Sequence, residues 1–147
     1  EGFKYLLLKN RSWRSPEFNC LFDGVVYAVA VSLGFALWEN IGYVFMYGLS
    51  TALVRAVMAV PGHACFGVFM GVFYGAAKRY EVYMQEAHSS FYRKLAVIFP
   101  VLIHGAYDFI ASMESDYASV LFFVFVIVLV LFSHRVVKNA AAKDQYL

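Results

Sequence analysis

The chain has 147 residues, of which 62% are hydrophobic and only 15% are charged, and its formal net charge is +2. A soluble domain carries about 25% charged residues, and one of this length cannot bury so much apolar surface. The composition therefore excludes a soluble domain, and the 19% aromatic content excludes a disordered segment. The small net charge gives no indication of nucleic acid as a partner, so we expect an integral membrane protein in contact with the lipid bilayer.

Four long apolar stretches follow one another along the chain, each near the roughly 20 residues with which a helix crosses a bilayer. They cover residues 22–47, 51–77, 95–113 and 118–132. An isolated strand cannot span lipid with its backbone unpaired, so these stretches predict helices. We expect an all-α, polytopic transmembrane helix bundle that forms one domain over residues 1–147.

Residues 1–8 indicate the last turns of another apolar helix, which we expect to end at Lys9 before Pro16 breaks the chain into a loop. The chain begins with Glu rather than Met, so we expect a fragment that lacks the start of this helix. Pro61 and Gly62 interrupt the second stretch and predict either a kink or a short lead-in helix followed by a second helix.

Basic residues alternate from loop to loop. Ten of them lie before the first span, between the second and third spans, or after the fourth span, and these positions share one side of the membrane. They are Lys9, Arg11, Arg14, Lys78, Arg79, Arg93, Lys94, Arg135, Lys138 and Lys143. The loop at residues 48–50 and the loop that carries Glu114 and Asp116 contain no base. The positive-inside rule then predicts that the basic ends and the C-terminus are cytoplasmic.

Polar side chains that are costly in hydrocarbon interrupt the apolar segments. They are Glu1, Lys4, Glu39, Asn40, Arg55, His63, His104 and Asp108. With a helical rise of about 1.5 Å per residue, the carboxylates and imidazoles of four segments lie about 12–24 Å from the basic ends. This shared layer, between the middle and the outer half of the bilayer, predicts one functional site. The alternative is a set of buried pairs that only fixes helix packing.

Spacing within the segments suggests pairs. His104 and Asp108 are four residues apart, so they share a helix face, where they can bind one metal ion or Asp108 can orient the imidazole. Glu1 and Lys4 are three residues apart, which permits an ion pair.

The first and second spans offer further pairs. Tyr43 follows Glu39 by one helical turn, so its phenol can hydrogen-bond the carboxylate. Asn40 points elsewhere and can satisfy backbone groups. Arg55 is either a snorkelling residue near the outer surface or a structural partner of Glu39.

Small residues also recur with a spacing of four after His63 in the second span. These residues are Gly67, Gly71 and Gly75. They predict the close approach of another helix to this face.

The polar set suits one kind of chemistry. Carboxylates with two imidazoles can activate a water molecule, with or without a divalent metal, and can stabilise an oxyanion. The hydrolysis of an amide needs both functions. The sequence contains no HExxH, no GxSxG and no phosphate-binding glycine loop.

Four stretches, residues 1–5, 23–43, 55–67 and 104–109, resemble the PrsW family of bacterial intramembrane proteases. The family pattern begins with Glu-Glu-x-x-Lys. Glu1 and Lys4 match its second Glu and its Lys, and we expect the first Glu to precede this sequence. The other matching positions here are Glu39-Asn40, Tyr43, Arg55, Pro61-x-His63 and His104-x-x-x-Asp108. The family is distantly similar to the type II CAAX prenyl endopeptidases, whose last motif ends in Asn where this chain has Asp108.

The resemblance implies cleavage of a membrane-anchored protein, an anti-sigma factor, near the extracytoplasmic side of a bacterial plasma membrane. Glu1 would act as the general base on a water molecule. His63 and His104 would bind a divalent metal together with Asp108 or Glu39, and zinc suits such nitrogen and oxygen ligands best. Without a metal, the imidazoles would stabilise the oxyanion. Supporting positions would be Lys4, Asn40, Tyr43 and Arg55.

Two other functions stay open at this point. Intramembrane Glu, His and Asp also build the proton relays of transporters, although the chain shows no inverted repeat. A catalytically inactive scaffold would use its glycine-rich face to bind a partner's transmembrane helix.

Overall fold

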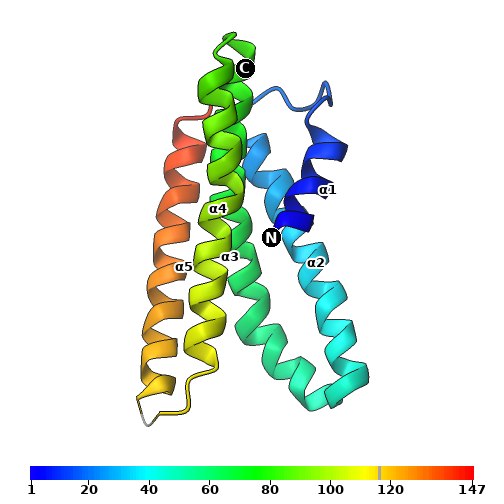
Figure 1. Cartoon of the computed structure of the whole chain (residues 1–147), viewed down its shortest axis with the longest axis vertical. Coiled ribbons are helices and arrows are strands. Elements are labelled where there is room, and N and C mark those ends of the chain that lie inside the picture. The colour runs from blue at the N-terminus through cyan, green and yellow to red at the C-terminus, as the bar shows by residue number, and fades with distance from the viewer. Residues whose placement is uncertain (116) are drawn as a thin grey trace.

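The computed structural model describes residues 1–115 and 117–147 and forms a bundle of helices (Figure 1). The helices are α1 (Gly2–Ser12), α2 (Asp23–Tyr47), α3 (Leu49–Val82), α4 (Glu86–Ala111) and α5 (Ala118–Ala142). The last four are each long and apolar enough to cross a membrane. The predicted all-α transmembrane bundle is therefore confirmed, whereas Asp116 lies outside the described residues.

The helix boundaries differ from the sequence-based prediction in several places. Helix α1 continues past Lys9 to Ser12. Helices α4 and α5 also extend beyond their apolar stretches, because charged residues continue a helix where it leaves the hydrocarbon. Between α2 and α3 only Gly48 remains outside a helix, and its φ of +84° is a conformation that glycine adopts without strain.

Pro61 does not divide the second span. Helix α3 is continuous across it, so the expectation of a lead-in helix followed by a second helix is wrong. Figure 1 shows that the first turns of α3 lean away from α4 and α5 toward the turn at Gly48. Neighbouring helices can support a proline in a membrane helix, which explains why the helix persists.

The glycine face of α3 packs closely against another helix, as predicted, and the structure shows that this helix is α2. A Cβ atom added to Gly71 would lie 2.6 Å from the carbonyl oxygen of Gly24, and one added to Gly67 would lie 2.9 Å from the Cα atom of Val29. A Cβ on Gly75 would likewise meet the backbone of Leu21. The backbones of α2 and α3 therefore touch along a seam formed by the three glycines of α3. This contact fixes the position of α2 along α3.

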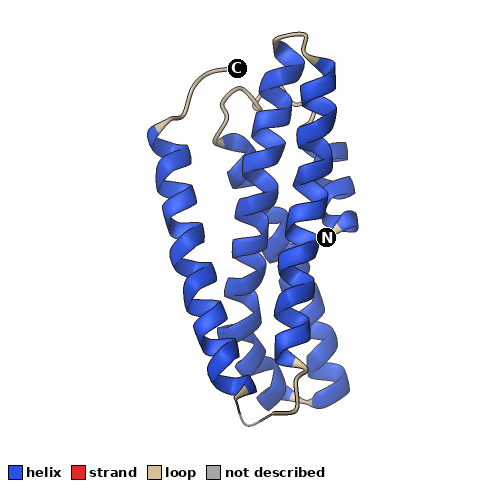
Figure 2. Ribbon diagram, turned by 60° about the vertical axis from the view of Figure 1, so that its left-hand side comes forward, coloured by secondary structure: helices blue, strands red, loops and turns tan. Residues whose placement is uncertain are grey.

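Helix α1 is anchored at its C-terminal end. The indole nitrogen of Trp13 donates a hydrogen bond of 3.0 Å to Glu81, and Lys78 donates one of 3.0 Å to the carbonyl oxygen of Trp13. The hydroxyls of Ser12 and Tyr74 lie 2.9 Å apart in the same region. Helix α1 extends from this anchor toward the middle of the bundle. Glu1, at its N-terminal end, therefore lies about half-way along the bundle (Figures 1 and 2).

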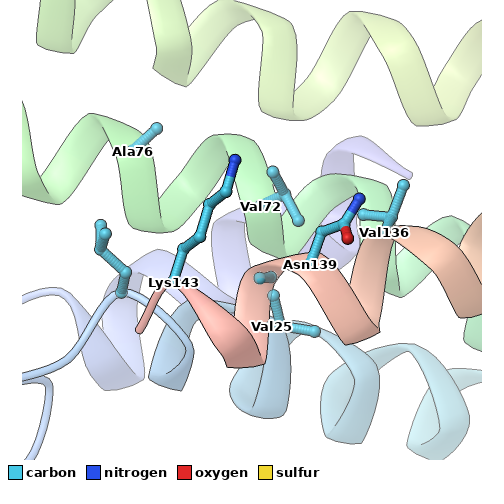
Figure 3. Close-up of a pocket in the computed structure, with 8 residues that line it drawn as sticks. Val25, Val72, Ala76, Val136, Asn139 and Lys143 are labelled. Carbon is cyan, nitrogen blue, oxygen red and sulfur yellow. The ribbon is translucent and has the colours of Figure 1, made fainter. Parts of the chain in front are cut away.

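The ends of α1, α3 and α5 and the starts of α2 and α4 lie at the same end of the bundle (Figure 1). The C-terminal tail is held there, because Leu147 donates a backbone hydrogen bond of 2.8 Å to Asn19. A cavity of about 310 Å³ lies between α2, α3 and α5 near this tail, with Lys143 at its edge (Figure 3). Its walls are mainly apolar, and none of the intramembrane polar residues lines it.

Candidate active site

The carboxylate of Glu1 lies at the start of α1, enclosed by α3 and α4. Its side chain is 2% exposed. Lys4 donates a hydrogen bond to Glu1 Oε1, as the spacing predicted, and His104 Nδ1 lies 2.8 Å from the same oxygen. An ionised carboxylate only accepts hydrogen bonds, so His104 Nδ1 carries the proton that it donates.

His63 on α3 is the most deeply buried imidazole of the site, with 3% exposure. Its Nδ1 lies 2.9 Å from the ammonium of Lys4, and its Nε2 lies 3.0 Å from Glu39 Oε2. An ammonium has no lone pair to offer, so His63 Nδ1 must accept from Lys4. The proton of the neutral ring is then on Nε2, where it is donated to Glu39, and the Nδ1 lone pair faces Lys4 and Glu1.

Glu39 on α2 has a second partner from α3. Arg55 donates a hydrogen bond of 3.0 Å to Glu39 Oε2, which decides between the two interpretations of this arginine in favour of a partner for Glu39. Tyr43 does not bind the carboxylate in the part of the chain that the structure describes. Its ring lies instead beneath the Arg55 guanidinium, 3.5 Å from the ring centre. Asn40 donates to the backbone oxygen of Ala52 over 3.1 Å, which ties α2 to α3 beside this group.

Asp108 lies at the outer edge of the site. Its Oδ2 is 3.5 Å from His104 Nε2, and its side chain is 68% exposed. The two imidazoles thus have similar surroundings. His63 turns Nδ1 toward Lys4 and His104 turns Nδ1 toward Glu1. Each imidazole also has a carboxylate, Glu39 or Asp108, on the side of Nε2.

Three of these side chains can share one metal ion. Glu1, His63 and His104 each offer a ligand atom, and these atoms lie within 4.8 Å of one another. Glu39 and Asp108 do not belong to this group among the described residues. Glu1 Oε2 supports the fit, because it is buried and has no hydrogen-bond partner among the described residues. Such an atom is destabilising unless it has a cation or a water molecule to bind.

Two groups around the histidines were not predicted from the sequence. Ser32 on α2 is fully buried and donates a hydrogen bond of 2.6 Å to the backbone oxygen of His63. Phe66 stacks on the His104 ring with centroids 4.6 Å apart. The sequence does show a serine within an apolar helix and an aromatic residue one turn after His63. Both residue types are common in membrane helices without any functional role, so neither indicated the site.

Comparison with known proteins assigns the chain to a family. A sequence profile described as "PrsW family intramembrane metalloprotease" matches residues 1–133. The chain belongs to the PrsW family.

Curated PrsW proteins resemble the chain over most of its length. The "Protease PrsW" of Shouchella clausii is 36% identical over 96% of this chain and 63% of the relative. That of Halalkalibacterium halodurans is 37% identical over 99% of this chain and 65% of the relative. The "Protease PrsW" of Bacillus subtilis is 36% identical over 80% of this chain and 52% of the relative. The chain thus spans just under two thirds of the length of the first two relatives, and no solved structure matches it.

Proposed function

We propose that this PrsW-family chain carries the catalytic residues of an intramembrane endopeptidase that hydrolyses a peptide bond in a membrane-anchored protein. The observation that carries the proposal is the convergence of Glu1, His63 and His104, whose ligand atoms lie within 4.8 Å of one another. These residues come from three helices, and the side chains of Glu1 and His63 are almost fully buried. Polar groups this costly in a membrane are typical of functional sites.

The residues that would hold a divalent metal are His63 and His104, with the Glu1 carboxylate in reach of the same point. His104 Nδ1 would give up the proton that it donates to Glu1 when it binds the metal. Zinc suits this set of nitrogen and oxygen donors. When bound, such an ion supplies a Lewis acid that lowers the pKa of water and polarises a carbonyl group. Glu39 and Asp108 then act as orienting carboxylates rather than as ligands, because they lie on the far sides of the imidazoles.

The chain's own groups account for the proton transfer. Lys4 donates a hydrogen bond to Glu1 Oε1, which fixes the carboxylate and leaves Oε2 free to accept the proton of a water molecule. This is the role of a general base. The Lys4 ammonium lies beside the same carboxylate, where its positive charge stabilises the oxyanion that develops on the peptide carbonyl.

The proposed location is the plasma membrane of a bacterial cell, with the C-terminus in the cytoplasm. Ten of the chain's twelve Lys and Arg residues lie at the ends of α1, α3 and α5 and at the start of α4, which share one end of the bundle, and this supports the orientation. Glu1 lies about half-way along the bundle (Figure 2), which supports cleavage within the membrane rather than at its cytoplasmic surface. The resemblance to PrsW proteases supports an anti-sigma factor as the substrate.

Elemental analysis of the purified full-length protein tests the metal. We expect close to one equivalent of zinc in the wild type and a loss of it in His63→Ala, because that change removes an imidazole from the centre of the site. His88→Ala is the matched control, since His88 is exposed and stacks on Tyr80. Cleavage without bound metal would instead support a glutamic mechanism, in which the imidazoles donate to the oxyanion.

The two outer carboxylates should differ in importance. Glu39→Gln is expected to reduce metal affinity or cleavage by about 10–100-fold, as is usual for a carboxylate that orients a metal-binding histidine. Asp108→Asn should have a smaller effect, because Asp108 is 68% exposed and lies 3.5 Å from its histidine. The measurement is the cleavage rate of an epitope-tagged single-span substrate. An Asp108→Asn defect larger than that of Glu39→Gln would contradict the assigned positions.

A further inference from the structure

A groove between α1 and α2 leads to the site from the lipid-facing surface. Its volume is about 500 Å³, and its walls are largely apolar. The residues that line it are Phe3, Lys4, Leu7, Val31, Gly34, Phe35 and Trp38. On each helix these positions lie three or four residues apart or are adjacent, so the groove runs along one face of α1 and one face of α2.

Lys4 connects this groove to the reactive groups. It is 1% exposed, contributes to the groove wall, and donates hydrogen bonds to Glu1 and His63. Phe35 borders both regions as well, since the Lys4 ammonium lies 5.0 Å from its ring centre and the His63 ring 6.2 Å away. An occupant of the groove would therefore lie beside Glu1 and His63.

The outer rim of the groove is open. Phe3 is 67% exposed and Trp38 is 75% exposed, so both present apolar surface to the surroundings of the bundle. Gly34 also lines the groove, and a Cβ atom added there would meet nothing within 4 Å. The absence of a side chain at Gly34 therefore leaves this part of the groove clear.

We propose that this groove binds the substrate as an extended apolar segment of a single-span membrane protein, which approaches sideways from the lipid between α1 and α2. This inference rests on the proposed protease function and adds the route and the form of the substrate. From Val31 to Trp38 the α2 wall is about 10 Å long, which matches about three extended residues. An extended segment leaves its backbone carbonyls free to accept a hydrogen bond from Lys4 beside the base, whereas a helix keeps them in its own hydrogen bonds.

A size series at Gly34 tests the groove. In the full-length protein reconstituted with an epitope-tagged single-span anti-sigma factor, Gly34→Phe should reduce cleavage at least tenfold, and Gly34→Ala should have little effect. Gly42→Phe is the matched control, because Gly42 lies on the same helix outside the groove and also has open space at its Cβ position. Equal cleavage by the Gly34→Phe and Gly42→Phe variants would overturn the proposal.

Photo-crosslinking separates this proposal from the protease function, because it does not depend on turnover. A p-benzoylphenylalanine in place of Trp38 should crosslink the tagged substrate. The same group in place of Leu37, which is 63% exposed but outside the groove, should not. A crosslink at position 38 without any cleavage by the wild type would sustain the groove and reject the protease function. Crosslinks at position 38 to lipid alone, or to another part of the chain, would reject the groove.

Discussion

Cleavage of a tagged single-span substrate should fall by about 10²–10⁴-fold when Glu1 is replaced with Gln, the range usually lost with a general base. The amide has nearly the same size as the carboxylate, so the helix start keeps its shape. It cannot take up a proton, however, and it replaces the negative charge that faces Lys4 and His104. The expected loss is therefore chemical rather than structural.

The control for this change is Glu86→Gln. Glu86 pairs with Arg93 at the surface and is 70% exposed, so its replacement should leave cleavage within about twofold of the wild type, as is usual for exposed ion pairs. Helical content by circular dichroism should be unchanged in both variants. A Glu1→Gln protein that cleaves as fast as Glu86→Gln would exclude Glu1 as the base. His63→Ala and His104→Ala should likewise abolish cleavage while the fold is retained.

The sequence predicted the fold because the bilayer imposes strong rules. A helix must be about 20 residues long and apolar to cross it, and α2 to α5 meet this requirement. The boundaries were less predictable, since the turns of α4 before Leu95 are charged yet helical. Pro61 was also a poor guide to a helix boundary, because neighbouring helices can support a proline in a membrane helix and α3 continues across it.

The composition of the site could be foreseen, but the geometry within it could not. Helical rise placed Glu1, His63 and His104 in one layer of the membrane, yet a shared depth does not determine which side chains meet. Rotation about each helix axis decides that Glu39 pairs with Arg55 and that Tyr43 stacks on the guanidinium instead. These contacts depend on the seam between α2 and α3. The glycine spacing predicted a close helix contact on this face of α3, but not that α2 makes it or at which height along α3.

This seam is the basis of the second large expected effect. Gly71→Ala should reduce the free energy of unfolding by about 2–3 kcal/mol, as overpacked cores usually do. Its new Cβ atom would lie 2.6 Å from the Gly24 carbonyl oxygen and 2.9 Å from the Val25 amide nitrogen. Both are backbone atoms that cannot rotate away, so α2 must move as a whole.

The matched control is Gly42→Ala, whose Cβ atom has open space around it. Replacing a helical glycine with alanine gains about 1 kcal/mol when nothing obstructs it, so this variant should melt at the same temperature as the wild type or higher. Thermal unfolding in detergent, followed by circular dichroism, measures the difference. Because α2 carries Glu39 and α3 carries His63, separation of the seam should also lengthen the 3.0 Å contact between them and slow cleavage. A Gly71→Ala protein as stable as Gly42→Ala would mean that α2 and α3 do not pack backbone to backbone, and the position of Glu39 would then need another explanation.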